Sequence, residues 1–508
     1  MPLPELPFPG ERLRPQRIGI DTGGEHVAYL PQGSPACHGE GFGPHSRLQV
    51  SIGPRRLMAT LAIVQGERLA ADEVGLSESA WLRLQPAAHE HVTLAHPPSV
   101  ESLSSVRAKL YGRVLAEAEV RAIVADIAAH RYSNIEMAAF IAACSDDHLD
   151  LDEVVALTAA MVDSGARLRW PGPVILDKHC VGGLPGNRTT PIVVSICTAL
   201  GLTMPKTSSR AITSPAGTAD TMAMLAPVEL DLARMRRTVE HTGGCIVWGG
   251  AINLAPVDDT LIRIERALDI DSPGQLVASI LSKKIAAGST HVVIDMPVGP
   301  TAKVRDPRRA RTLERMLRAV AERFGLALTV LRTDGAQPVG RGVGPALEAH
   351  DVLAVLQNLP AQPQDLRERA LALAAAVIEA GGRAAGEPSL ALARECLDSG
   401  RAWRQFQAIC QAQGGLRSPG VAPYRRPVAA CRGGRVEAVD NRRLAQAAKL
   451  AGAPLSPLAG LSIDVRLGDP VVVGQPLFTL HAQSPGELAY AMEYVSRHPD
   501  IVHLGAAA

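Results

Sequence analysis

The pattern of hydrophobic and polar positions changes along the chain, and its first part predicts short strands. Residues 1 to about 98 alternate brief apolar runs with glycine and proline, as at 17–20, 26–30, 48–52 and 58–64. Short strands at near-regular spacing favour a small β-barrel or sandwich. The run 91–94 would be its last strand, and Pro97 and Pro98 mark the boundary.

The second part, about 99–166, changes to a helical period. Apolar residues fall on one face of predicted helices at Leu110, Val114, Leu115, Val120, Ile123, Val124 and Ile127, and again from Leu151 to Leu157. Asp150 precedes Glu153 by three residues, which is typical of a helix N-cap with its reciprocal partner. A helical lobe is therefore expected here.

The third part, about 167–415, alternates strand-like with helix-like runs. The candidate strands lie at 174–176, 204–207, 245–248, 292–294 and 328–331. This alternation predicts an α/β lobe with a doubly wound, mixed or mostly parallel sheet. Ligands of such sheets bind at the carboxyl ends of the strands.

The last part, 416–508, is strand-rich again and predicts a C-terminal α+β domain. Residues 462–477 resemble the folded-back strands of a biotinyl-like or lipoyl-like hammerhead. No lysine occupies the turn at which such carriers hold their cofactor, so a structural role is expected.

Composition narrows the class of partner. The 508 residues carry 52 Lys and Arg against 51 Asp and Glu, a net charge of +1, with 4 Trp, 6 Tyr and 6 Phe. Neither nucleic acid nor an acidic membrane has an electrostatic attraction to such a chain. The 8 cysteines lack the spacing of zinc ligands. No apolar stretch approaches the ~18 residues of a membrane-spanning helix. No secretory segment is recognised before the first predicted strand. A cytoplasmic location is therefore expected.

Two polar segments that follow predicted strands have the composition of an anion site. The first, 177–190, combines Lys178 with glycines at 182 and 183, whose backbone N–H groups can approach an anion. Thr190 before Pro191 predicts a helix N-cap, and a helix N-terminus attracts phosphate. The second segment, 206–220, holds six hydroxyls, and Ser214 before Pro215 predicts another cap. Both helix starts are expected to converge on one phosphate.

A third segment, 278–284, places Ser279 and Lys283 four residues apart, on one face of a predicted helix. Together, Asp177-Lys178-His179 with its glycine turn, the segment 207–220 and the segment 278–284 resemble the thymidine/pyrimidine-nucleoside phosphorylases over about residues 100–508. The N-terminal extension and the short sequence motifs at 208–213 and 335–340 resemble those of the branch that also holds the archaeal AMP phosphorylases.

The resemblance implies an architecture and a chemistry. Part of 257–286 would complete the helical lobe, which would form the interface of a homodimer. The N-terminal domain would join dimers into a larger assembly, as a hypothesis. Phosphate would attack the anomeric carbon with inversion through an oxocarbenium-like transition state, so inorganic phosphate is a co-substrate and no cofactor is implied.

The resemblance also implies roles for individual residues. Phosphate would contact Lys178, Cys180, Gly182, Gly183, Thr190, Ser208 and Thr218. The base would contact His179, Arg266, Ser279 and Lys283, with Arg263 as the alternative to Arg266. A nucleotide in the AMP-cleaving branch would contact Gly183, Ser209, Arg210, Ala211, Ile212, Thr213, Ser214, Thr218, Ser279 and Lys303. Asp271 matches the proton donor, and catalysis would rest on it together with His179 and Lys178.

Two features depart from the family pattern. Cys180 stands where the family has a serine, and a thiol is a weaker hydrogen-bond donor than a hydroxyl. The loop at Leu184, Pro185 and Gly186 carries one extra residue.

The predicted reaction is phosphorolysis of thymidine to the free base and 2-deoxy-α-D-ribose 1-phosphate. The first alternative is phosphorolysis of AMP or another nucleoside 5′-monophosphate to base and ribose 1,5-bisphosphate. A phosphoribosyltransferase and a non-catalytic nucleotide-binding protein are the remaining alternatives.

Overall fold

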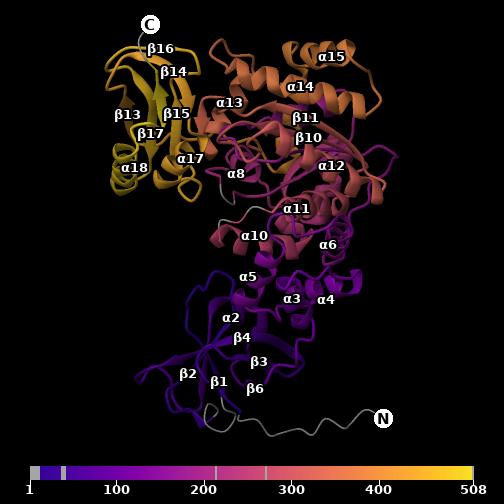
Figure 1. Cartoon of the computed structure of the whole chain (residues 1–508), viewed down its shortest axis with the longest axis vertical. Coiled ribbons are helices and arrows are strands. Elements are labelled where there is room, and N and C mark those ends of the chain that lie inside the picture. Colours follow the sequence, from indigo (N-terminus) through magenta and orange to yellow (C-terminus); the bar gives the residue numbers. More distant parts are fainter. Residues whose placement is uncertain (1–11, 36–41, 212–213, 269, 271, 506–508) are drawn as a thin grey trace. The chain divides into compact units, whose positions relative to one another are not determined.

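The computed structural model describes residues 12–35, 42–211, 214–268, 270 and 272–505, which belong to two compact units, Met1–Ala143 and Cys144–Ala508 (Figure 1). Each unit has its own core, and each is described by itself. Of the predicted site residues, Ile212, Thr213 and Asp271 lie outside the described part, as does the side chain of Arg266.

The first unit contains a closed β-barrel. Its strands are β1 (Arg14–Arg17), β2 (Val27–Pro31), β3 (Arg47–Ile52), β4 (Arg55–Val64), β5 (Glu73–Leu76) and β6 (Thr93–Ala95), in the sheet order β1-β5-β2-β4-β3-β6. Leu13 and Val92, which flank the two outermost strands, exchange backbone hydrogen bonds of 2.9 and 2.8 Å and so join the edges. Of the two predicted alternatives, barrel and sandwich, the barrel is the observed one.

The inward side chains of these strands are fully buried, among them Leu30, Leu48, Val50 and Leu61. The alternating burial along β3 is the two-residue period from which the strand was predicted. Helix α2 (Glu78–Leu84) lies between β5 and β6, and α3 (Leu103–Leu110), α4 (Glu117–Ala128) and α5 (Asn134–Ala143) complete the unit.

The second unit begins with α6 (Leu151–Asp163), whose N-cap is Asp150, as predicted. The Asp150 carboxylate accepts from the Glu153 N–H at 2.8 Å, and the Glu153 carboxylate accepts from the Asp150 N–H at 3.0 Å. Helix α6 packs against α11 (Pro273–Ala286), so the segment predicted to complete the helical lobe lies beside it. The domain boundaries themselves remain predictions.

A parallel sheet forms the centre of the second unit. Strands β11 (Ala327–Asp334), β10 (His291–Val298) and β7 (Leu176–Cys180) pair in that order, and β8 (Met204–Ser208) pairs with β9 (Gly244–Trp248). The Leu176 N–H donates to the Thr203 carbonyl at 3.0 Å, so β7 and β8 lie side by side. The predicted α/β lobe is confirmed.

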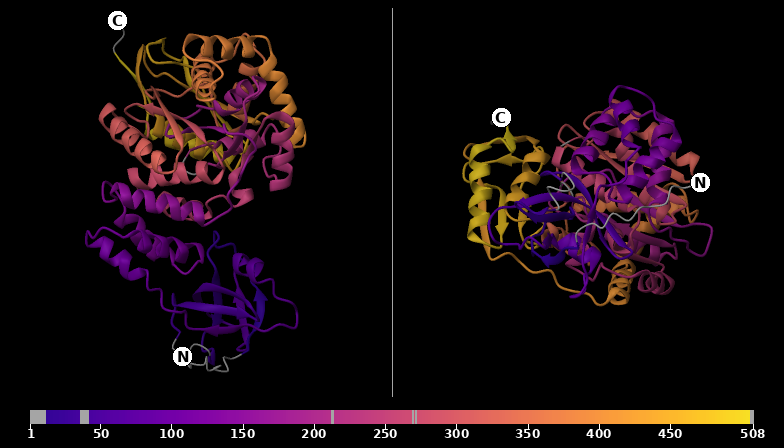
Figure 2. Two further views of the ribbon diagram at one scale, coloured as in Figure 1. Left: turned by 90° about the vertical axis from the view of Figure 1, so that its right-hand side faces the viewer. Right: turned by 90° about the horizontal axis from the view of Figure 1, so that it is seen from below.

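Helices cover this sheet on both faces. Helix α14 (Gln364–Ala380) packs on β7, β10 and β11, whereas α12 (Pro307–Arg323) packs on β10 and β11 from the other side (Figures 1 and 2). Helices α7 (Thr190–Ala199), α13 (Pro345–Leu356), α15 (Glu387–Asp398) and α16 (Arg401–Gln413) join the layer of α14, and their apolar faces form one large core. Helices α8 (Thr218–Ala223), α9 (Leu232–Thr242) and α10 (Pro256–Leu268) lie between the strands in sequence.

Three local predictions were wrong. The strand predicted at 174–176 shares only Leu176 with β7, which begins at that residue and ends at Cys180. Thr189, rather than Thr190, is the N-cap of α7, so Thr190 is its first helical residue. Ser214 does not cap a helix: its hydroxyl donates to the Ala216 carbonyl, and α8 begins after Gly217, where the Asp220 carboxylate accepts from the Gly217 N–H at 2.9 Å.

The C-terminal part of the second unit is the predicted α+β domain. Its elements are β13 (Tyr424–Ala429), β14 (Gly434–Val439), α17 (Asn441–Leu450), β15 (Gly460–Ile463), β16 (Pro470–Val471), β17 (Pro476–Ala482), α18 (Pro485–Arg497) and β18 (Val502–Leu504). Strand β12 (Gly342–Val343) from the α/β lobe joins its sheet in the order β12-β15-β17-β13. None of the described helices has both the length and the apolar character needed to span a membrane.

Candidate active site

Strand β7 carries four consecutive predicted or neighbouring site residues at its carboxyl end. Lys178 is buried, and its Nζ donates to the Thr189 Oγ1 at 2.7 Å. Asp295 on β10 lies 3.9 Å from the same Nζ and is held by the Asn187 amide at 2.9 Å and the Thr333 hydroxyl at 2.7 Å. Lys178 is thus fixed between the strand and the start of α7.

Buried charged side chains also surround the preceding residue, Asp177. Its carboxylate is 2.8 Å from Lys284 Nζ and 3.2 Å from Lys206 Nζ, and it accepts from the Lys178 N–H at 2.6 Å. Burial alone would raise the pKa of Asp177, but the two ammonium groups outweigh burial and lower it. Burial lowers the pKa of Lys284. Two cations share one carboxylate here, so the cluster is electropositive.

The position of His179 decides its protonation state. Burial lowers the pKa of His179 well below 6.5, and the charges of Lys284, Lys206, Lys283 and Lys178 lower it further. A neutral imidazole can donate one hydrogen bond and accept another, but it is a poor proton donor at neutral pH. His179 therefore suits a hydrogen bond to a base better than protonation of that base.

Cys180 is also uncharged. Burial and the nearby Asp295 carboxylate raise the pKa of its thiol to about 12, and its Sγ accepts from the Asn187 amide at 3.3 Å. The Asn187 amide thus bridges Cys180 and Asp295, which orders the residues just before α7.

The glycine turn is held by two close backbone approaches. At Gly183 (φ +75°) a Cβ would lie 2.4 Å from the Lys303 backbone nitrogen, so these two predicted site residues are in contact. At Gly186 (φ +80°) a Cβ would lie 1.9 Å from the Val339 carbonyl oxygen, and the Val339 N–H donates to the Pro185 carbonyl at 3.2 Å. The extra residue of this loop is therefore tied to the segment after β11.

The second predicted loop follows β8. Ser208 ends the strand, and its Oγ is buried without any hydrogen-bond partner among the described residues. A buried hydroxyl without a partner is costly, and a bound ligand would satisfy it. At Gly217 a Cβ would lie 2.5–2.6 Å from backbone atoms of Ser209, Arg210 and Ala211, so the start of α8 packs directly on this loop.

Arg188 connects the two loops. Its guanidinium donates to the Thr218 Oγ1 at 2.6 Å, to the Ala216 carbonyl at 2.9 Å and to the Glu348 carboxylate at 2.7 Å. Of the predicted phosphate residues, Arg188 thus fixes Thr218, whereas Lys178 and Ser208 lie on the neighbouring strands β7 and β8 and Thr190 lies in the first turn of α7.

The Arg210 side chain is paired with carboxylates. Its guanidinium lies 3.3 Å from the Asp220 carboxylate and 2.7 Å from the Glu229 carboxylate, and it stacks 4.9 Å above the Trp248 ring. Two carboxylates offset its single charge. This environment disfavours the predicted grip of Arg210 on a 5′-phosphate.

Lys283 of α11, a predicted base-binding residue, lies near enough to His179 for its charge to lower the pKa of that imidazole. Lys283 Nζ lies 2.5 Å from the Asp258 carboxylate and 3.9 Å from that of Asp259, and these charges outweigh burial and raise the pKa of Lys283. Ser279 is one turn earlier on the same helix, and Arg263 is exposed on α10. The alternative between Arg263 and Arg266 stays open.

Five residues of this site received no individual role from the sequence: Lys206, Lys284, Arg188, Asp295 and Glu348. Apart from contacts with near neighbours in the chain, their partners lie 28 to 160 positions away, and no spacing rule connects such pairs. The available signals were local charges: Lys206 at the start of the second polar segment, Lys284 beside Lys283, and Arg188 in the first polar segment.

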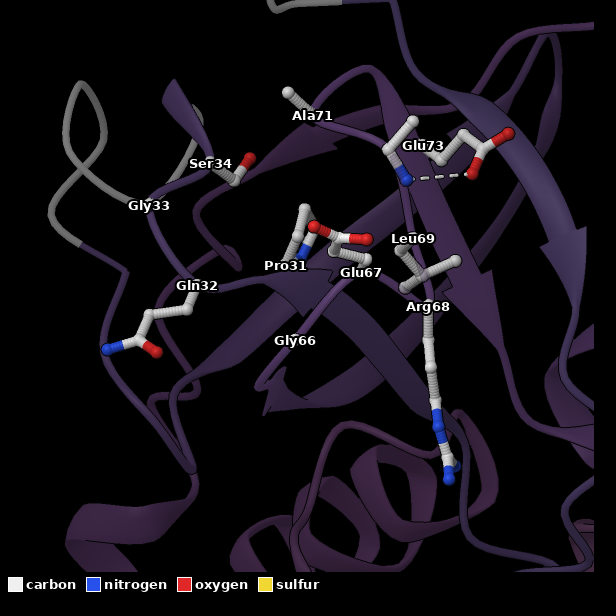
Figure 3. Close-up of a pocket in the computed structure, with 11 residues that line it drawn as sticks. Pro31, Gln32, Gly33, Ser34, Gly66, Glu67, Arg68, Leu69, Ala71 and Glu73 are labelled. Atoms are coloured by element: carbon white, nitrogen blue, oxygen red, sulfur yellow. Dashed lines mark hydrogen bonds between the residues drawn. The ribbon is translucent and has the colours of Figure 1, made fainter.

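A separate pocket of about 500 Å³ lies in the N-terminal barrel, between the turn at 31–34 and the loop at 66–73 (Figure 3). Within it the Glu73 carboxylate accepts from the Ala70 N–H at 2.9 Å. None of the predicted site residues that the structure describes lines this pocket, so it is not the candidate active site.

The fold and the site together define a glycosyl transferase. Residues 104–165 match the glycosyl transferase family's helical bundle domain, and residues 172–403 match its a/b domain. The solved anthranilate phosphoribosyltransferase from Thermus thermophilus shares this fold, with a TM-score of 0.51 and 20% identity over 61% of this chain and 99% of that one.

Further matches narrow the family. Residues 435–501 match the pyrimidine nucleoside phosphorylase C-terminal domain. Proteins named "Putative thymidine phosphorylase" from Polaromonas sp. strain JS666 and Maricaulis maris strain MCS10 are 57% and 56% identical, over 99% and 97% of this chain and 98% and 95% of their own. The "Putative thymidine phosphorylase 1" of Acidovorax sp. strain JS42 is 58% identical over 98% of this chain and 97% of its own. The chain belongs to the thymidine and pyrimidine-nucleoside phosphorylase family.

Proposed function

We propose that this enzyme cleaves thymidine with inorganic phosphate, giving thymine and 2-deoxy-α-D-ribose 1-phosphate. The observation that carries the proposal is the set of hydrogen-bond donors at the ends of β7 and β8, in which Lys178 is fixed and the buried Ser208 hydroxyl has no partner within the described part of the chain. Charge-assisted donors of this kind are suited to an oxyanion such as phosphate.

The proposed mechanism assigns the chain a positioning role. Lys178, the N–H groups of the glycine turn and the hydroxyls of Ser208 and Thr218 would hold phosphate on one side of the sugar. Phosphate would form the new bond to the anomeric carbon as the bond to the base nitrogen breaks. Holding both reactants in line supplies much of the rate enhancement without a protein nucleophile.

On the other side of the sugar, neutral His179 would donate a hydrogen bond to a base carbonyl, and the Lys283 ammonium, charged because its pKa is raised, would stabilise negative charge on the departing base. Asp271 remains a predicted proton donor and lies outside the described residues.

One observation disfavours a 5′-monophosphate as substrate, and a second removes an argument for it. Arg210 is offset by Asp220 and Glu229. The relatives cover the N-terminal extension as well and carry thymidine phosphorylase names, so the extension by itself does not favour a nucleotide substrate.

The test is phosphate-dependent release of free base from thymidine, uridine, AMP and CMP, followed by chromatography. Release from thymidine that requires phosphate and is lost in Lys178→Ala supports the proposal. Release from AMP and CMP alone would overturn it in favour of a nucleotide phosphorylase. The predicted homodimer is tested separately by light scattering, which should give twice the chain mass.

A further inference from the structure

We propose that Arg188 is a positioning residue, which turns the Thr218 hydroxyl into a dedicated donor for phosphate. The inference rests on the proposed function and deepens it, because the family resemblance gave Arg188 no role. Arg188 lies in the first polar loop between Asn187 and Thr189, yet its three contacts are all with other segments.

The guanidinium is fixed by its own geometry. It presents donors in a rigid planar fork, and here each of the three nitrogens has one acceptor, on Glu348, Thr218 and Ala216, at 2.7, 2.6 and 2.9 Å. The side chain is 13% exposed, and that of Glu348 is 2% exposed. A largely shielded fork with three acceptors has one orientation.

Glu348 is in turn held in place. Its carboxylate accepts from the Thr221 hydroxyl at 2.9 Å and from the Gly344 N–H at 3.4 Å, and it lies on α13. Thr221 is one turn after Thr218 on α8, so Glu348 binds both the arginine and the helix that the arginine orients. The contacts join α8, α13 and the loop before α7 into one support.

The consequence for Thr218 follows from the chemistry of a hydroxyl. A hydroxyl has one hydrogen to donate, and its oxygen accepts. Because the Thr218 oxygen already accepts from the cationic Arg188, its own hydrogen must be donated elsewhere, and the cation strengthens that donation. An anion at the start of α8 is the fitting acceptor.

Arg188→Lys keeps the charge but loses the fork, and it should raise KM for phosphate about tenfold, the size of one charge-assisted hydrogen bond. KM for thymidine should change by less than about threefold. A purely structural defect would instead raise KM for both substrates. Arg367→Lys is the matched control, since Arg367 is 11% exposed and lies 2.6 Å from Asp398 in another part of the unit.

A double-mutant cycle tests whether Arg188 affects phosphate binding through Thr218. Thr218→Val should itself raise KM for phosphate. Adding Arg188→Lys to Thr218→Val should raise this KM by less than about a further twofold. Independent, multiplying effects would overturn the proposal, as would an unchanged KM for phosphate in Arg188→Lys.

Two further measurements distinguish a failure of this inference from a failure of folding and from a failure of the proposed function. If Arg188→Lys fails to fold, Arg188→Gln combined with Glu348→Gln removes both buried charges and should show the same weakened phosphate binding, whereas wild-type affinity would refute the proposal. If the wild-type enzyme releases no base, the proposed function fails, and calorimetric titration with inorganic phosphate then decides the role of Arg188 alone.

Discussion

Replacing Asp177 with asparagine removes the one carboxylate that, among the residues the structure describes, contacts both Lys206 and Lys284. The two ammonium groups lie 3.2 and 2.8 Å from it, and all three side chains are at most 5% exposed. Removing one partner of a buried ion pair typically costs about 3–5 kcal/mol, because the remaining charge stays desolvated. Burial already lowers the pKa of Lys284 to about 7, so Lys284 can release its proton at little cost near neutral pH.

One uncompensated charge, that of Lys206, should therefore dominate the loss of stability. For a unit that spans Cys144–Ala508, a loss of about 3–5 kcal/mol lowers the melting temperature by about 4–7 °C. Between about pH 7 and 10.5 the unfolded chain holds more protons on Lys284 than the folded chain, so this lysine makes stability rise with pH. In Asp177→Asn its folded pKa falls further, so the deficit should be larger at pH 6 than at pH 9.

The assay is calorimetric melting at pH 6, 7.5 and 9. Asp500→Asn is the matched control, because its exposed partner Arg443 lies 2.6 Å away, and no measurable change is expected there. Adding Lys206→Met to Asp177→Asn removes the stranded charge and should recover most of the loss. A double variant no more stable than Asp177→Asn would refute the reasoning, as would a deficit that grows with pH.

Three further predictions concern single residues of the site. The pKa of His179 is lowered, so its imidazole should show no titration between pH 6 and 8 by NMR against His179→Gln; a midpoint in that range would contradict it. Iodoacetamide at pH 8 should label exposed Cys431 and spare native Cys180, whose pKa is about 12, as peptide mass spectrometry would show; equal labelling would count against a neutral thiol at the half-buried Cys180. Gly186→Ala should lower the melting temperature much more than Gly325→Ala: both glycines have positive φ, but only Gly186 faces a backbone carbonyl, 1.9 Å from the added Cβ. Strain from positive φ alone costs about 1 kcal/mol, so similar losses would refute the close approach.

The strands with regular apolar runs were predictable from the sequence. Those at 204–207 and 245–248 differ from β8 and β9 by a single residue at one end. Strand β7 was misplaced because Asp177 and Lys178 look like loop residues, although both are buried through ion pairs. Charge pairing with α11 and β8 overrides their polarity, and an alternation pattern contains no information about distant partners.

The site was predictable only as far as local composition reaches. Lys178 and the glycine turn were identified from their residue types. The cap at Ser214 was wrong because the Asp220 carboxylate, three residues into the turn of Gly217, serves the N-terminus of α8 instead. Arg188 looked like an ordinary loop arginine, since its acceptors come from α8 and α13.

The closure of the N-terminal sheet by Leu13 and Val92 affects how this unit can associate. Among the described strands, β1 and β6 are the outermost, and the two bonds join the chain beside them. An open edge offers unpaired N–H and C=O groups that recruit strands from other chains, whereas a closed sheet offers none. If the barrel does join dimers, recognition must come from its outward side chains, so point substitutions on its surface should be enough to separate them.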